Sequence, residues 1–214
     1  MTVYCDVDGT LLDSSARHLR LMQNLLGQEN CPWPDDAPDY LTYKADGHST
    51  RAWLETAGFS AEKAAELAAR WQAQIEDPAY LAMDRPYDDA APFLQAVRQL
   101  PARIVLVSAR QNPEALRQTL ADCGLLPLVD ELVVVPPRHA ADEKAARLRP
   151  RIAPGDCMVG DTEADLQAAQ QLGMPCYLLN RGFRSRRYWQ QQGQTAEDSL
   201  PAVLRAITDP NKED

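Results

Sequence analysis

The chain has 214 residues, of which 45% are hydrophobic and 25% are charged, and its formal net charge is −9. It is long enough for one globular domain, or for a core domain with a small accessory one. No apolar run approaches the roughly 18 residues that cross a bilayer, and the one basic cluster, at residues 181–187, is too short for a nucleic-acid-binding face. We expect a cytoplasmic protein, because residues 1–7 lack the pattern of a secretory signal.

The first 85 residues combine one short strand with a long helical stretch. An apolar run predicts a buried strand at residues 2–7. From there to about residue 85 no convincing strand pattern occurs. Apolar spacing instead indicates helices around residues 19–26, 53–54 and 60–75, with a Pro-rich loop at 31–38. About 70 such residues are too many for a simple connection, so we predict an all-α cap domain over residues 14–85.

The remainder of the chain alternates strands with helices. Further strands are predicted at the apolar runs 103–107, 131–135, 157–159 and 176–179. Two of the helices between them are well delimited, at residues 112–124 and 162–173, each with a final glycine. The order predicts an α/β fold, with a doubly wound, Rossmann-like parallel sheet over residues 1–13 and 86–208. A polar tail is expected at residues 209–214.

The cysteines contain no metal or redox motif. None forms a Cys-x-x-Cys pair, which a zinc knuckle or a redox pair needs. We interpret them as reduced core or surface thiols; they are Cys5, Cys31, Cys123, Cys157 and Cys176.

The first predicted strand ends in Asp6-Val7-Asp8-Gly9-Thr10. A spacing of two on an extended strand places both carboxylates on one face, where they repel each other. A divalent cation or a shared proton would offset that repulsion. Gly9 permits a tight turn and a close backbone approach to a ligand. The alternative interpretation is an Asp-rich turn that only closes the strand.

The segment DVDGTLLDS, from Asp6 to Ser14, resembles the first motif of the haloacid dehalogenase superfamily, in its phosphatase branch. The resemblance implies that Asp6 attacks phosphorus and forms an aspartyl-phosphate. It also implies that Asp8 protonates the leaving oxygen and then activates water. Dehalogenases of the superfamily lack an acid at this second position, so a carbon–halogen substrate is not expected. The helical insertion after the first motif is typical of the helical-cap class of the family, and within it the chain most resembles the phosphoglycolate phosphatase-like group.

The second motif of the superfamily is a polar residue at the end of the next core strand. Ser108 occupies that position and is expected to bind a phosphoryl oxygen, helped by the backbone N–H of Ala109 and by the side chain of Arg110. With Gly9 and Thr10, these residues form the expected phosphate-binding set.

The third motif supplies a cation beside the nucleophile. Lys144, at the start of a helix predicted over residues 143–148, is the expected residue, although the usual proline does not follow it. Arg138 and His139 are the alternatives.

The fourth motif is Gly160-Asp161-Thr162-Glu163-Ala164-Asp165, which closely matches the Gly-Asp-x-x-x-Asp signature of the superfamily. The resemblance implies that Asp161 binds a metal ion. Asp165 lies one helical turn further on the same side and is expected as a partner or a water-mediated ligand. With Asp6 and Asp8 they predict a Mg²⁺ site, because such a set of carboxylates suits Mg²⁺ rather than zinc.

The most polar stretch of the predicted cap is residues 43–51. Lys44, His48 and Arg51 are expected to contact the non-phosphate part of the substrate; the alternative is a solvated turn. The expected partner is a small phosphorylated metabolite, with no nucleic acid and no membrane, and the protein is expected to be a monomer or a homodimer. Two other functions stay open: a phosphomutase or phosphotransferase of the superfamily, and a non-catalytic binding module.

Overall fold

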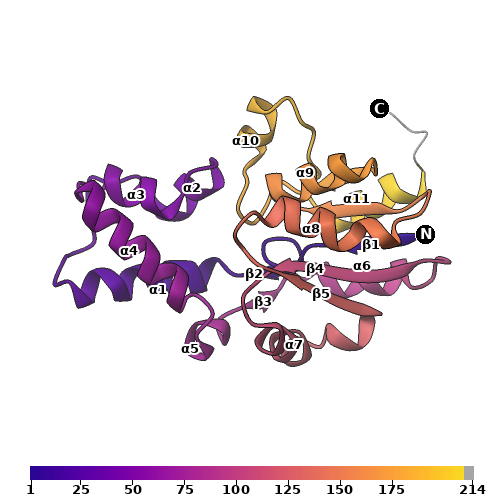
Figure 1. Cartoon of the computed structure of the whole chain (residues 1–214), viewed down its shortest axis with the longest axis horizontal. Helices are drawn as coiled ribbons and strands as arrows, with labels where there is room; N and C mark the ends of the chain where they lie inside the picture. Colours follow the sequence, from indigo (N-terminus) through magenta and orange to yellow (C-terminus); the bar gives the residue numbers. More distant parts are fainter. Residues whose placement is uncertain (210–214) are drawn as a thin grey trace.

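The computed structural model describes residues 1–209, and at its centre lies a five-stranded sheet (Figure 1). The strands are β1 (Thr2–Cys5), β4 (Arg103–Ala109), β5 (Glu131–Val135), β6 (Cys157–Gly160) and β7 (Cys176–Leu178). Their order is β5-β4-β1-β6-β7, and every neighbouring pair is parallel. The predicted α/β fold with a parallel sheet is confirmed.

Helices cover both faces of the sheet, because apolar side chains point to both sides of its strands. Val3 and Cys5 pack into one hydrophobic core, whereas Tyr4 between them faces the other. The helices on the first face are α6 (Ala90–Val97), α7 (Pro113–Asp122) and α11 (Leu200–Thr208). Those on the second face are α8 (Ala140–Leu148) and α9 (Glu163–Leu172).

Several element ends differ from the prediction. β1 stops at Cys5 rather than at residue 7, because the carbonyl of Val7 accepts the N–H groups of the turn that follows. β7 stops at Leu178 because Leu179 bridges to Glu197 instead. α8 begins at Ala140, three residues before the predicted start, after His139 in a left-handed conformation. Lys144 therefore lies in the second turn of this helix.

Residues 14–84 form a helical group at one end of the molecule (Figure 1). A two-stranded antiparallel pair, β2 (Leu12–Asp13) and β3 (Arg85–Pro86), marks where the chain leaves and re-enters the sheet region. The helices between these strands are α1 (Ser15–Gln28), α2 (Tyr40–Ala45), α3 (Thr50–Thr56), α4 (Ala61–Gln74) and α5 (Pro78–Leu81). They enclose a hydrophobic cluster of their own around Trp53 and Leu67. The domain boundaries at residues 14 and 85 stay a prediction.

The short elements of the structure have no counterpart in the prediction. They are α2, α5, the pair β2–β3, α10 (Arg186–Gln191) and two 3₁₀ turns, Leu126–Leu128 and Arg149–Arg151. Each is too short for apolar periodicity to distinguish it from a loop.

Three smaller expectations concern the polar tail, the cysteines and membrane-spanning helices. The predicted polar tail lies outside the described residues, except for residue 209. All five cysteines are free, as the sequence predicts. Within residues 1–209 no helix is long and apolar enough to cross a membrane.

Replacing Asp156 by alanine is expected to lower the free energy of unfolding by about 1–3 kcal/mol. This buried carboxylate accepts the backbone N–H of Thr2 at 2.6 Å and that of Ala153 at 2.9 Å, so it links the start of β1 to the loop before β6. Urea unfolding followed by circular dichroism measures the loss. The exposed Asp36 is the control, and its alanine variant should stay within about 0.5 kcal/mol of the wild type. Equal losses in the two variants would contradict the prediction.

Candidate active site

The C-terminal edge of the sheet gathers three polar strand ends. Asp6 follows β1 and Asp161 follows β6. Ser108 is the next-to-last residue of β4. These strands are neighbours, because β1 lies between the other two. The backbone N–H of Asp6 donates to the carbonyl of Val159 at 2.9 Å, which fixes where the chain leaves the sheet. Ligands of open parallel sheets bind beyond this edge.

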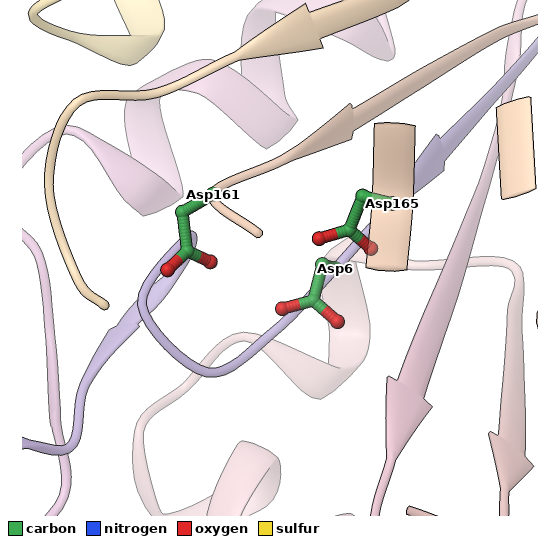
Figure 2. Close-up of side chains that lie close together, drawn as sticks. All are labelled: Asp6, Asp161 and Asp165. Atoms are coloured by element: carbon green, nitrogen blue, oxygen red, sulfur yellow. The ribbon is translucent and has the colours of Figure 1, made fainter. Parts of the chain in front are cut away.

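Three buried aspartates meet here (Figure 2). One carboxylate oxygen from each of Asp6, Asp161 and Asp165 lies within 4.8 Å of the other two. Asp165 extends from the first turn of α9, where it accepts the backbone N–H of Thr162 at 3.2 Å and its hydroxyl at 2.8 Å. This capping arrangement orients its side chain. Two strand ends and one helix therefore supply converging oxygen atoms.

Lys144 brings a buried ammonium group into the same cluster. Its Nζ donates to Oδ1 of Asp6 and to Oδ1 of Asp165, both at 2.6 Å, and the residue is only 1% exposed. Burial disfavours the charged form, but the two carboxylates prevail and raise the pKa of Lys144 above its ordinary value. Within residues 1–209, neither Arg138 nor His139 forms an ion pair with Asp6.

Asp161 is held by two loops that are far apart in the sequence. Its Oδ1 accepts the hydroxyl of Thr10 at 2.8 Å, and its Oδ2 accepts the backbone N–H of Phe183 at 2.9 Å. Gly9 passes close beneath it with φ at +82°, and a Cβ there would lie 2.8 Å from Oδ1 of Asp161. Only glycine fits this position. Gly9 and Thr10 thus surround the carboxylate, while their contact with phosphate stays a prediction.

The cluster contains more negative charge than Lys144 offsets. Burial raises the pKa of Asp6 well above its usual range, against the pull of Lys144 and with a further rise from Asp165. Burial, with Asp165 beside it, also raises the pKa of Asp161 to about 7. A divalent cation would offset this repulsion, and an all-carboxylate donor set suits Mg²⁺. The residues present therefore fit a magnesium ion held by Asp6, Asp161 and Asp165.

Asp8 has charged partners of its own, and its carboxylate is not part of the group formed by Asp6, Asp161 and Asp165; its role at a metal ion stays a prediction. Its Oδ1 accepts Nη2 of Arg17 at 2.7 Å and Nη2 of Arg110 at 2.6 Å, and its Oδ2 accepts Nε of Arg110 at 2.7 Å. Burial acts to raise its pKa, but the two guanidinium groups lower the pKa of Asp8 below its ordinary value. These charge-assisted contacts hold the carboxylate of Asp8 against Arg17 of α1 and against Arg110.

Asp84 completes this network from the segment between α5 and β3. Its carboxylate lies 3.1 Å from Nε of Arg17 and 2.9 Å from Nη2 of Arg110, and its side chain is fully buried. Burial raises the pKa of Asp84 to about 6. The network joins the helical group to the sheet edge at both connecting segments. Sequence reasoning missed Arg17 and Asp84, since charged residues in a helical stretch are usually solvated and nothing in their spacing indicates burial.

The basic segment at residues 181–187 also contributes to the site, which the sequence did not indicate. Arg181 pairs with Asp89 at 2.8 Å and donates to the carbonyl of Thr10 at 2.6 Å. Arg184 pairs with Glu163, whose side chain is 40% exposed. This segment therefore contacts the loop that follows β1.

Two hollows of about 400 Å³ each lie between the helical group and the sheet edge. The first is bordered by Asp8 and Arg110 on the sheet side and by Arg51 on the helical side. The second includes Lys44 and His48, and reaches Thr162 beside Asp161. Arg51 thus borders the first hollow, and Lys44 and His48 border the second.

An aspartate after the first strand, a buried lysine and a carboxylate cluster at the edge of a parallel sheet define an acidic, metal-compatible hydrolase site. Comparison with known proteins is consistent with this class. The sequence signature of haloacid dehalogenase-like hydrolases matches residues 1–173. Because the match covers most of the chain, the protein belongs to this family.

Individual relatives place the chain near the phosphoglycolate phosphatases of the family. It is 26% identical to the phosphoglycolate phosphatase of Rhodobacter capsulatus, over 94% of this chain and 89% of the relative. A candidate phosphoglycolate phosphatase from Lactobacillus delbrueckii has the same fold, with a TM-score of 0.74, 22% identity and coverage of 96% and 97%. A candidate hydrolase of Bacillus subtilis, YfnB, solved with bound magnesium, has a TM-score of 0.63, 16% identity and coverage of 96% and 97%. The enzyme is classed with the phosphatases of the family.

Replacing Gly182 by alanine is expected to disturb the site, whereas replacing Gly193 is not. Both residues have a similar positive φ, +67° and +66°, so both variants incur a similar backbone cost of about 1–3 kcal/mol. A Cβ at Gly182 would lie 2.7 Å from the carbonyl oxygen of Gly9, whereas a Cβ at Gly193 meets open space. We expect phosphatase activity to fall at least about tenfold only in Gly182→Ala. Equal activity in the two folded variants would contradict the close approach.

Magnesium is expected to raise the melting temperature more at pH 8 than at pH 6. The pKa of Asp161 in the metal-free site is about 7, so at pH 6 its carboxyl mostly holds a proton that competes with the metal, whereas at pH 8 it is ionised. Thermal unfolding at fixed Mg²⁺ concentration measures the gain at each pH. Asp161→Asn should lose the gain, while the exposed Asp122→Asn keeps it. A gain independent of pH would contradict the assignment.

Proposed function

We propose that the protein is a magnesium-dependent phosphatase that hydrolyses a small phosphorylated metabolite through an aspartyl-phosphate on Asp6. The observation that supports this best is the buried contact of Lys144 with Asp6. A nucleophilic carboxylate must stay ionised beside an anionic phosphoryl group, and a cation held 2.6 Å away favours that state. The relatedness to a phosphoglycolate phosphatase agrees with this reaction class.

In the proposed reaction, a carboxylate oxygen of Asp6 attacks phosphorus, and the bond to the ester oxygen breaks. Asp8 gives its proton to that leaving oxygen and later takes a proton from the water that hydrolyses the aspartyl-phosphate. In the ligand-free arrangement, Arg17 and Arg110 keep Asp8 ionised. To serve as the acid, its carboxyl must leave one of these partners and take up a proton. Its proposed action is thus on protons rather than on the metal ion.

The other residues of the site bind and orient the substrate in this proposal. Ser108, with the backbone N–H of Ala109, would hold phosphoryl oxygens, and Arg110 would do so when it is released from Asp8. Magnesium, held by Asp6, Asp161 and Asp165, would neutralise charge that develops on the phosphoryl group. The magnesium bound to the Bacillus subtilis neighbour is in keeping with this choice of ion.

Residues 14–85 are proposed to act as a cap domain over this site. Their helices share a hydrophobic cluster, and the paired β2 and β3 strands form a narrow connection to the sheet region. The cap would exclude water during transfer and contact the rest of the substrate. A cytoplasmic location, and a monomer or homodimer without nucleic-acid or membrane partners, stay predictions.

Transfer of the phosphoryl group to a sugar, as in a phosphomutase, is the second candidate. The same aspartyl-phosphate would form, and only the acceptor would differ. A non-catalytic binding module is disfavoured, because a module of that kind has no need for a buried lysine between two carboxylates, which is costly to desolvate. Release of inorganic phosphate from a sugar phosphate, without an isomeric product, would identify hydrolysis.

Replacing Asp6 by asparagine is expected to lower magnesium-dependent hydrolysis of an aryl phosphate roughly 1,000-fold or more, because the amide cannot form the phosphoenzyme. Release of the aryl alcohol measures the rate. The exposed Asp122→Asn, in α7, is the matched control and should keep wild-type activity. Chelation of Mg²⁺ should stop the wild-type reaction, and adding the ion back should restore it. Activity that survives in Asp6→Asn would overturn the nucleophile, and activity in excess chelator would overturn the metal requirement.

A further inference from the structure

A carboxylate of the helical group contacts the loop between β4 and α7, residues 110–112, which is called the β4–α7 loop below. Glu76 lies between α4 and α5, and it accepts the backbone N–H of Gln111 at 2.7 Å and that of Asn112 at 2.9 Å. The side chain of Gln111 also donates to the carbonyl of Gln72, in the last turn of α4, at 3.1 Å. Three hydrogen bonds therefore join the end of α4 to this loop.

Both ends of the β4–α7 loop are fixed by other parts of the chain. At one end, β4 is paired with β5 as far as Ala109. At the other end, the side chain of Asn112 caps α7 by accepting two backbone N–H groups at 3.1 Å. The N–H groups of Gln111 and Asn112 lie between these ends, and Glu76 is the acceptor for both. Successive N–H groups in a turn favour an anion, which here is the carboxylate of Glu76.

The position of Glu76 is set by the packing of the helical group. The preceding residue, Ile75, is 8% exposed and packs with Leu21 and Leu25 of α1. The carboxylate of Glu76 is thus attached to the hydrophobic interior of the helical group. It can contact the β4–α7 loop only while that group lies against the edge of the sheet.

The negative charge of Glu76 lies beside the expected phosphate site. Glu76 borders the first hollow together with Ala109 and Arg110. A carboxylate at this place repels a phosphate dianion, so it weakens phosphate binding unless it has another role. The buried Nη1 of Arg110 has no hydrogen-bond partner within residues 1–209. A loop that presents this group and the N–H of Ala109 to an anion needs a fixed backbone, and Glu76 supplies the acceptors that fix it.

We propose that Glu76 is a positioning residue, which holds the β4–α7 loop in its phosphate-binding arrangement while the helical group is docked on the edge of the sheet. It acts through the backbone of Gln111 and Asn112 and does not touch the phosphoryl group. Docking of the helical group and formation of the phosphate site are then linked, because withdrawal of Glu76 removes two acceptors from the loop. The inference rests on the proposed function for the location of the phosphate site, but its binding test requires no turnover.

The binding test titrates inorganic phosphate into the full chain in the presence of Mg²⁺, by calorimetry. Glu76→Ala is expected to weaken phosphate binding about tenfold or more, because both charge-assisted acceptors of the loop are lost. Glu76→Gln keeps one oxygen acceptor, so its affinity should lie between those of Glu76→Ala and the wild type. The control, Glu114→Gln, removes an exposed charge from the first turn of α7 and should bind phosphate as the wild type does. Circular dichroism verifies that each variant is folded.

The direction of the change separates positioning from charge repulsion. If Glu76 acted only through its charge, Glu76→Gln would bind phosphate more tightly than the wild type, whereas loss of positioning weakens binding. Hydrolysis of an aryl phosphate gives a second readout. We expect Glu76→Ala to raise KM about tenfold and to change kcat less, because the loop would hold the phosphoryl group in the ground state and in the transition state alike.

Hydrogen exchange tests the contact itself. The backbone N–H groups of Gln111 and Asn112 should exchange at least about tenfold faster in Glu76→Ala than in the wild type or in Glu114→Gln. Phosphate affinity that is equal or tighter in both Glu76 variants would overturn the inference. A wild type that binds phosphate but hydrolyses no phosphate ester would overturn the proposed function alone, and the affinities of the variants would still decide the inference. A wild type that binds no phosphate with Mg²⁺ would overturn both.

Discussion

The structure depends on how buried negative charge is balanced at one edge of the sheet. Three carboxylates lie within 4.8 Å of one another, and a single lysine contacts two of them. Such a cluster is unstable in a protein interior without further positive charge. The raised pKa values of Asp6 and Asp161 reflect this imbalance. The same imbalance makes the site suitable for a divalent cation, whose charge would offset the repulsion between the carboxylates.

A second set of buried charges connects the helical group to that edge. Asp8 and Asp84 share Arg17 and Arg110, which come from α1 and from the loop after β4. The removal of one member would leave uncompensated charge, so the four residues act as a unit. A substrate that binds either arginine must change the ion pairs among these four residues. In the proposed reaction, contact of Arg110 with the phosphoryl group and proton transfer by Asp8 would therefore be coupled, because the two residues share an ion pair.

Much of the fold followed from apolar patterning. Nearly continuous apolar runs predicted the five parallel strands, and their positions were wrong by at most two residues at either end. The helices α1, α4, α7, α8 and α9 were predicted as well, because their apolar spacing extends over several turns, whereas α6 and α11 were not predicted. The start of α8 was missed, since His139 offers no capping side chain there. The pair β2–β3 was missed because two residues are too few to show a period.

The sequence by itself determined that Asp6 and Asp161 meet at the edge of the sheet. A polar residue directly after a buried parallel strand must lie at the C-terminal edge, so Asp6 and Asp161 were bound to converge. Only the tertiary structure decided what each charge contacts. Asp8 forms ion pairs with two arginines, whereas Lys44 donates to the hydroxyl of Thr50. The two arginines lie 9 and 102 positions from Asp8 in the sequence, and only the folded chain brings these side chains together.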